Sequence, residues 1–209
     1  MRGLLLDGWT AVEAMLPATG RHFLAQFDAD TVTVFQSFDR DVGGYAIEHG
    51  QFGGPAFRRD RASAIRLSLL DVLGRSDWGQ KPGREVTLAL RLRREAFDMV
   101  LRQAIHSVFP EGVYPMKRSW QLATRYSPVS ITWEADRDLS GNPLSRDAAR
   151  FGLRDRTLMQ FATEWIEDVI DLSPWVSAHR GDLQALVPQR APYPVRDDAL
   201  HARLTYEGP

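Results

Sequence analysis

One β-strand stands out in this sequence of 209 residues: Thr31-Val32-Thr33-Val34-Phe35-Gln36-Ser37-Phe38. β-Branched and aromatic residues dominate it, which is typical of strands. Side chains alternate between the two faces of a strand, so the even-numbered positions share one face. Gln36 is the polar residue among them, near the end of the strand, and this makes it a candidate functional residue.

A helix is expected directly after this strand. Asp39 is placed to cap a helix over residues 39–49, and Gly50 is placed to end it. The next segment, 51–57, is too rich in glycine and proline for regular structure. Beyond it, apolar residues recur at helical spacing over 64–75.

The rest of the chain continues as alternating helices and strands. We predict strands over residues 86–92, 128–134 and 149–153, helices over 8–17, 94–108, 116–124, 155–170 and 174–186, a polar loop over 135–146 and an extended tail from Val187. The strands are few and form no clean βαβ repeat. The prediction is an α+β fold with a small, mostly antiparallel sheet, split or continuous, flanked by helices. We expect one domain over 1–209, with its core at about 22–190 and with helix 8–17 and tail 187–209 at the periphery.

Composition excludes several classes of partner. Hydrophobic residues make up 44%, charged residues 25%, and the formal net charge is −1. No general nucleic-acid binding is expected from such a balance. The apolar run Leu4-Leu5-Leu6 ends at Asp7, shorter than the roughly 7–15 residues of a signal peptide or the about 20 of a membrane helix. The chain has no cysteine, which suits the cytoplasm, and no membrane partner is expected.

Several familiar chemistries have no motif in the sequence. Without cysteine there is no thiolate nucleophile, iron–sulfur cluster or cysteine zinc site. No phosphate-binding loop, dinucleotide-binding glycine motif or Gly-x-Ser-x-Gly elbow occurs. The five histidines are scattered singly, so no metal site is predicted.

The densest functional signal lies in residues 58–68, which hold four arginines and two serines just after the glycine-rich loop. Arginine binds phosphate or carboxylate with two parallel hydrogen bonds, and hydroxyls near a helix start add neutral donors. The candidate ligand-binding residues here are Arg58, Arg61, Ser63, Arg66 and Ser68. The alternative interpretation is a solvated basic turn in which Ser63 caps a helix.

Two further segments carry candidate residues. Trp78 and Lys81 lie in a loop over 77–83, where Trp78 could stack on the ring of a ligand. The alternative is that Trp78 closes the edge of the core. Glu164 is a candidate catalytic acid, and the alternative is a solvated helix face.

Six segments, taken in order, resemble the family called domain of unknown function 4291, over roughly residues 22–190. They are residues 28–38, 61–68, 76–83, 88–92, 128–139 and 164–166. The chain departs from the family pattern at several positions. Phe35 and Phe38 replace two tyrosines, Ala64 a tryptophan, Leu67 a proline, Asp147 an arginine and Arg150 a glutamine. The resemblance implies a pocket altered at these positions.

The order of the elements is also similar to the ADP-ribosyltransferase fold, whose split sheet binds NAD. That resemblance implies roles for the candidates. Phe35 and Gln36 would line the cleft, Arg61, Ser63 and Arg66 would hold a pyrophosphate, Trp78 would stack on a ring, and Gln36 and Glu164 would be catalytic. This resemblance makes NAD the candidate cofactor. No residue pattern in the sequence itself specifies a cofactor.

Three hypotheses remain open from the sequence. The first is a transferase that uses NAD or another nucleotide. The second is an enzyme on the same scaffold acting on a more apolar small molecule, since phenyl rings in place of phenols make a drier pocket. The third is a non-catalytic binding or accessory protein. The ligand site requires the end of the strand 31–38 and the arginine-rich segment 58–68 to face each other across one cleft, and we expect Gln36, Arg61 and Arg66 to converge there.

Overall fold

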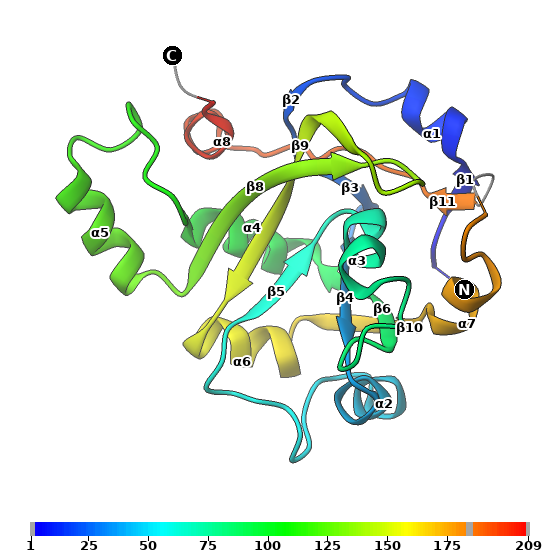
Figure 1. Cartoon of the computed structure of the whole chain (residues 1–209). Helices are drawn as coiled ribbons and strands as arrows, with labels where there is room; N and C mark the ends of the chain where they lie inside the picture. The colour runs from blue at the N-terminus through cyan, green and yellow to red at the C-terminus, as the bar shows by residue number, and fades with distance from the viewer. Residues whose placement is uncertain (1–2, 183–185, 208–209) are drawn as a thin grey trace.

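The computed structural model describes residues 3–182 and 186–207, and a mixed sheet with helices on both faces lies at its centre (Figure 1). The strands are β1 (Leu6–Gly8), β2 (Gly20–Arg21), β3 (Leu24–Phe27), β4 (Thr31–Phe38), β5 (Ser63–Arg66), β6 (Val86–Arg93), β7 (Ala104–His106), β8 (Val129–Arg137), β9 (Pro143–Leu153), β10 (Ile166–Asp171), β11 (Leu186–Pro188) and β12 (Ala191–Pro192). The helices are α1 (Trp9–Ala14), α2 (Arg40–His49), α3 (Leu69–Ser76), α4 (Arg94–Gln103), α5 (Lys117–Tyr126), α6 (Asp155–Thr163), α7 (Ser173–Ala178) and α8 (Asp198–Thr205). The predicted α+β class is confirmed.

Ten strands of the described chain join in one sheet. The main path runs β10-β6-β4-β5-β9-β8-β7, with β2, β3 and β12 attached beside it. Neighbouring strands are antiparallel except for two parallel pairs, β7 with β8 and β2 with β9. The sheet has more strands than the sequence indicated, because several are only two to four residues long.

The sheet is split between β4 and β5. On one edge, β4 pairs with β6 along its whole length. On its other edge, β4 pairs first with β3 and then with β5, at the single position Phe35 opposite Arg66. β5 then runs along β9, from Ser63 opposite Leu153 to Arg66 opposite Arg150. Two halves of the sheet therefore meet at one rung.

Each face of the sheet has its own apolar core. Val34 and Ile65 belong to the core that packs against α2, α4 and α6. Phe35 belongs to the opposite core, which packs against α1, α3 and α7. Because side chains alternate along β4 and β5, Ser37 and Arg66 lie on the α3 face, whereas Gln36 and Ser63 lie on the other face.

The first predicted elements are reproduced closely. β4 has the predicted bounds, Thr31–Phe38. α2 follows with Asp39 as its cap, whose Oδ1 accepts a hydrogen bond from the backbone N–H of Val42 at 2.8 Å. Gly50 ends the helix with φ of 68°, a left-handed conformation that costs glycine little.

The helix predicted over 64–75 is wrong in its first part. β5 occupies Ser63–Arg66, and helix α3 begins only at Leu69. Ile65 is fully buried between β4 and β9, and this burial favours a strand although its spacing from Leu69 also suits a helix. Ser63 therefore does not cap a helix.

Two other predicted helices are too long for the same reason. The helix predicted over 94–108 ends at Gln103, and the next residues pair with β8 as β7. The helix predicted over 155–170 ends at Thr163, and β10 then pairs with β6. In both cases pairing with a neighbouring strand outweighs local helical periodicity.

The C-terminal predictions also need correction. The helix predicted over 174–186 ends at Ala178, and residues 183–185 lie outside the described part of the chain. The loop predicted over 135–146 is much shorter, because β8 and β9 extend into it as a hairpin. The tail from Val187 is not wholly extended, since it contains α8.

A buried ion cluster ties both ends of the described chain to the hairpin. Arg146 on β9, 1% exposed, donates from Nε to Asp136 at 2.9 Å and from Nη1 and Nη2 to Glu13 of α1, each at 2.6 Å. Arg190 lies 3.1 Å from the same Asp136 carboxylate. Burial by itself would raise the pKa of Asp136, but the ion pairs with Arg190 and Arg146 hold it below the ordinary value of 3.8.

We predict that Asp136→Asn lowers the free energy of unfolding by about 3–5 kcal/mol, because it leaves two buried guanidiniums without their shared counter-charge. Since the pKa of Asp136 is lowered in the folded state, its contribution is present above pH 3.8 and is lost as the pH falls through its folded pKa. Urea unfolding between pH 3 and 7 measures both effects. A variant as stable as the parent at pH 7 would contradict this account.

Candidate functional site

A pocket of about 360 Å³ lies where β4 and β5 diverge, and its lining residues come from these strands, from α3 and from the loop that follows α3. The described residues that line it are Ser37, Ala64, Arg66, Val72, Gly74, Arg75, Lys81 and Arg84. Four of these are cationic and none is acidic. We call this cavity the basic pocket.

Beyond the pair of Phe35 and Arg66, side chains rather than backbone pairing satisfy the backbone groups of β4 and β5 at the split. Gln36 donates from Nε2 to the carbonyl of Ala64 at 2.6 Å and to the hydroxyl of Ser63 at 2.9 Å. Arg84 donates from Nη1 to the carbonyl of Ser37 at 2.8 Å. Gln36 thus joins the two strands beyond the pair of Phe35 and Arg66, whereas Arg84 binds a carbonyl of β4 alone. The space left on the α3 face is the basic pocket.

One buried carboxylate, that of Asp71, forms ion pairs with several of the cations at the pocket. Asp71 on α3, 3% exposed, accepts hydrogen bonds from Nε of Arg66 and, at 3.1 Å, from Nε of Arg75. Nε of Arg137 lies 4.0 Å from the same carboxylate. One negative charge is shared among three guanidiniums, so Asp71 compensates them only in part.

A second carboxylate lies beside this group. Glu134 on β8 accepts a hydrogen bond from Nη2 of Arg75, and Nη1 of Arg150 lies 3.8 Å from its other oxygen. Arg150 stands opposite Arg66 in the register of β9 and β5. The cluster around the pocket therefore contains more guanidiniums than carboxylates, and a bound anion would be stabilised there.

Arg66 is the most desolvated cation of the pocket, with its side chain 13% exposed. Burial lowers the pKa of Arg66 below the ordinary guanidinium value, the charge of Asp71 opposes that effect, and the positive charge of Arg75 adds to it. Arginine nevertheless stays protonated in proteins, so its charge is retained. The lowered pKa of Arg66 reflects the burial of this cation, which the pairing with Asp71 offsets only in part.

The loop after α3 carries backbone strain. Asp77 and Trp78 have φ of 49° and 51°, and Gly79 has φ of 75°. Such left-handed conformations cost about 1–3 kcal/mol each for residues other than glycine and cluster at functional sites. Trp78 is half-buried against the core on the α3 face, which holds the turn in place. The turn brings Lys81 and Arg84 over the pocket.

Of the predicted ligand-binding residues, Arg66 and Lys81 line the basic pocket. Ser63 lies on the opposite face of β5 and bonds to Gln36. Ser68 is 2% exposed at the start of α3, and its hydroxyl has no hydrogen-bond partner among the described residues. Trp78 packs against the core beside the pocket rather than lining it.

The other candidates lie elsewhere. Phe35 is fully buried beneath α3. Arg58 is exposed and pairs with Asp60, and Arg61 is exposed outside the lining of the pocket. Glu164 lies just after α6, where its carbonyl accepts from Arg93 at the far end of β6 from the pocket. The expected convergence of Gln36, Arg61 and Arg66 on one cleft is therefore wrong.

The residues predicted from the sequence did not include Ser37, Arg75, Arg84 and Glu134. Arg75 could have been found by its i, i+4 spacing from Asp71 on a helix. Arg84 follows Pro82-Gly83, a dipeptide typical of turns that redirect the chain. No local signal marks Glu134, because only the hairpin register brings it to the cluster.

The sequence matches the family described as a domain of unknown function (DUF4291) over residues 22–193. The chain belongs to this family. No curated protein matches it. Of the positions at which the sequence was expected to differ from the family, Ala64 lines the basic pocket and Arg150 belongs to the adjoining charge cluster, whereas Phe35 is in the core.

Within the described residues, no helix combines the length and the apolar character needed to cross a membrane. No group of three or more histidine, aspartate or glutamate side chains within residues 3–182 and 186–207 is arranged to hold a metal ion.

We predict that Gln36→Ala lowers the free energy of unfolding by about 1–3 kcal/mol, because it removes both side-chain bonds between β4 and β5 and leaves Ala64 without its donor. Chemical denaturation measures this loss. Gln121→Ala, on an exposed position of α5, is the matched control and should change stability by less than about 0.5 kcal/mol. An unchanged stability in Gln36→Ala would mean that the amide does not hold the split together.

Proposed function

We propose that the basic pocket binds the phosphate of a small molecule, with a nucleotide such as NAD as the best candidate. The observation that carries this proposal is the set of four cationic side chains around one pocket, Arg66, Arg75, Lys81 and Arg84. Guanidinium forks bind phosphate with two parallel hydrogen bonds, and lysine adds a mobile point charge. The volume of about 360 Å³ falls within the range of small-molecule sites, roughly 300–1,000 Å³.

We further propose that the chain is a transferase similar to ADP-ribosyltransferases. The split sheet supports this, because the pocket opens where two halves of a sheet separate. In such a transfer the bond between ribose and nicotinamide breaks and its electron pair leaves with nicotinamide. The ribose carbon then bonds to an oxygen or nitrogen of an acceptor, which releases its proton to solvent. A carboxylate would stabilise the positive charge that develops on the ribose. Glu134, 25% exposed and adjoining the cluster, suits this role better than Glu164.

The two alternatives from the sequence have less support. An enzyme for a more apolar molecule would need phenyl rings in the pocket, but Phe35 is in the core and Phe38 packs against Phe52. The residues of the basic pocket are mostly polar. A non-catalytic binding protein would use the same anion site without a transfer step. The cysteine-free composition suits a cytoplasmic location, which we include in the proposal.

Thermal unfolding with NAD, ATP, GTP and pyrophosphate tests the binding step. A ligand present at 100 times its dissociation constant should stabilise the fold by about 2.7 kcal/mol. For a chain of this size that is a rise in Tm of roughly 5–10 °C. Lys81→Ala should weaken binding about ten-fold, because it removes one charged contact.

Arg58→Ala is the control, because Arg58 is a cation outside the pocket. It should leave ligand affinity unchanged. No shift with any of the four compounds, or an equal loss in both variants, would refute the site. Release of nicotinamide from NAD, measured by chromatography, then separates a transferase from a binding protein.

A further inference from the structure

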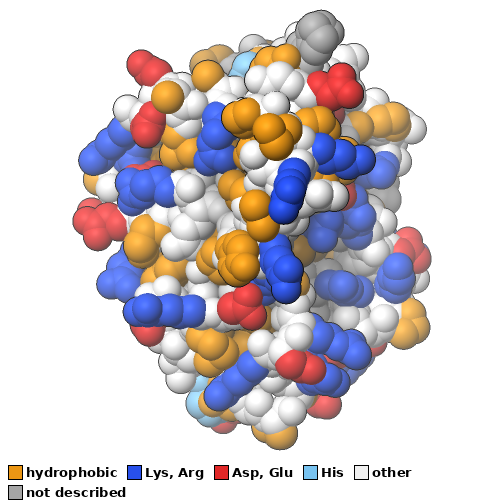
Figure 2. All heavy atoms as spheres, turned by 90° about the vertical axis from the view of Figure 1, so that its left-hand side faces the viewer, with side chains coloured by type: hydrophobic (Ala, Val, Ile, Leu, Met, Phe, Trp, Pro, Cys, Tyr) orange, Lys and Arg blue, Asp and Glu red, His pale blue; other side chains and the backbone are white. Residues whose placement is uncertain are grey.

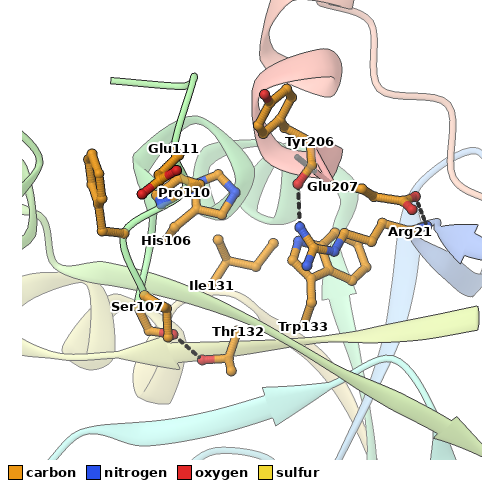
Figure 3. Close-up of a pocket in the computed structure, with 12 residues that line it drawn as sticks. Arg21, His106, Ser107, Pro110, Glu111, Ile131, Thr132, Trp133, Tyr206 and Glu207 are labelled. Atoms are coloured by element: carbon orange, nitrogen blue, oxygen red, sulfur yellow. Dashed lines mark hydrogen bonds between the residues drawn. The ribbon is translucent and has the colours of Figure 1, made fainter. Parts of the chain in front are cut away.

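A second cavity, of about 400 Å³, lies at the edge of the sheet beside β8 (Figure 3). Its walls come from the chain after β7, from β8, from Arg21 of β2 and from the end of α8. The lining residues are Arg21, His106, Ser107, Val108, Phe109, Pro110, Glu111, Ile131, Thr132, Trp133, Tyr206 and Glu207. None of these lines the basic pocket. We call this cavity the edge pocket.

The edge pocket adjoins an unpaired stretch of β8. β7 pairs with β8 only as far as His106 opposite Ile131, and the backbone N–H of Ser107 still donates to the carbonyl of Ile131 at 2.8 Å. β8 continues to Arg137, and no other described strand pairs with this edge. Backbone groups alternate in direction, so Trp133 turns its N–H and C=O to the same side as Ile131. Such an edge can pair with another extended chain.

The one cation of the edge pocket is already engaged. Arg21 donates from Nε to Asp147 at 3.2 Å and from Nη1 to the carbonyl of Tyr206. Its guanidinium also lies over the ring of Trp133, 5.8 Å from the ring centroid. Figure 3 shows this guanidinium across the cavity from His106. Arg21 therefore supports the wall and offers little charge to an anion.

His106 adds no positive charge. It is 4% exposed, and its Nε2 lies 3.1 Å from the carbonyl of Leu204, an acceptor, so Nε2 carries the hydrogen. Burial lowers the pKa of His106, which keeps the ring neutral at pH 7. Its Nδ1 is then an acceptor, and no described residue donates to it.

The groups that remain attract a cation. Glu207 uses one oxygen to accept from the backbone N–H of Arg21 at 3.0 Å, and Glu111 has no hydrogen bond or ion pair with a described residue. Two carboxylates thus face one engaged guanidinium. The aromatic rings of Phe109, Trp133 and Tyr206 also favour cations, because the face of an aromatic ring is electron-rich.

We propose that an extended peptide pairs with the free edge of β8 and places an arginine side chain in the edge pocket. The peptide backbone would bond to Trp133 in the line of β7, and the guanidinium would meet Glu111 between aromatic rings. Arginine suits the pocket better than lysine, because its planar head stacks on rings and bonds a carboxylate with two donors. This proposal is independent of the anion site.

The surroundings restrict the peptide further. Trp120 of α5 donates from Nε1 to the carbonyl of His106 at 2.8 Å, so α5 adjoins the edge pocket. α5 carries Lys117, Arg118 and Arg125, and no acidic residue. Figure 2 shows this side of the molecule, where cationic side chains surround exposed hydrophobic ones. The preferred partner therefore has one arginine flanked by acidic residues rather than a run of basic ones.

Fluorescence polarisation with labelled nine-residue peptides tests this. A peptide with central arginine and acidic flanks should bind, central lysine should weaken binding at least about five-fold, and central glutamine should abolish it. Glu111→Gln should weaken the arginine peptide about ten-fold. Glu48→Gln, an exposed position on α2 with the same charge change, should leave affinity unchanged.

Methylation of the peptide nitrogens that face β8 separates strand pairing from simple charge attraction, and it should remove binding. The proposal is overturned if no peptide binds, if glutamine and arginine peptides bind equally, or if Glu111→Gln binds like the parent. The Tm of the Glu111→Gln variant, measured alongside without ligand, should equal that of the parent and shows that the variant is folded.

Discussion

The rung between Phe35 and Arg66 is the constraint on which this structure depends. Because β4 and β5 share only this rung, their backbone groups beyond it need other partners, and Gln36 and Arg84 supply them. A continuous ladder would satisfy those groups and leave no opening between the two halves of the sheet. The split therefore accounts both for the basic pocket and for the polar side chains found buried around it.

The charges around the pocket follow from the same split. The side chain of Arg66 lies on the α3 face of the sheet, and Asp71 of α3 forms an ion pair with it there. Asp71 is shared with Arg75 and approached by Arg137, so the carboxylate fixes the cations in place without neutralising them. Uncompensated charge of this kind lowers stability, and so does the left-handed turn at Asp77 and Trp78. Both features are understandable if a ligand supplies the missing anion.

Local sequence signals correctly predicted the elements that are determined by residues within or next to them. β4 needs only its β-branched run, and α2 needs only Asp39 and Gly50. The errors fall where pairing across the fold decides, since Ile65 has helical spacing from Leu69 but lies between two strands. For the site, the sequence picked out Arg66 and Lys81 from composition. It could not show that Gln36 connects β4 to β5, because its partners Ser63 and Ala64 lie 27 and 28 residues away and meet it only in the folded sheet.

The two cavities differ in charge because strand pairing ends in a different way at each of them. At the split, a strand separates from its neighbour inside the sheet, and the freed backbone carbonyls accept from the Gln36 amide and the Arg84 guanidinium. At the outer edge of β8, β7 simply stops, and acidic and aromatic side chains surround the exposed backbone. A near-neutral chain, with net charge −1, can therefore carry a pocket lined by cations and a pocket lined by acidic and aromatic side chains only a few strands apart. Because their lining residues do not overlap, charge changes in one pocket should reach the other only through screened, long-range interactions.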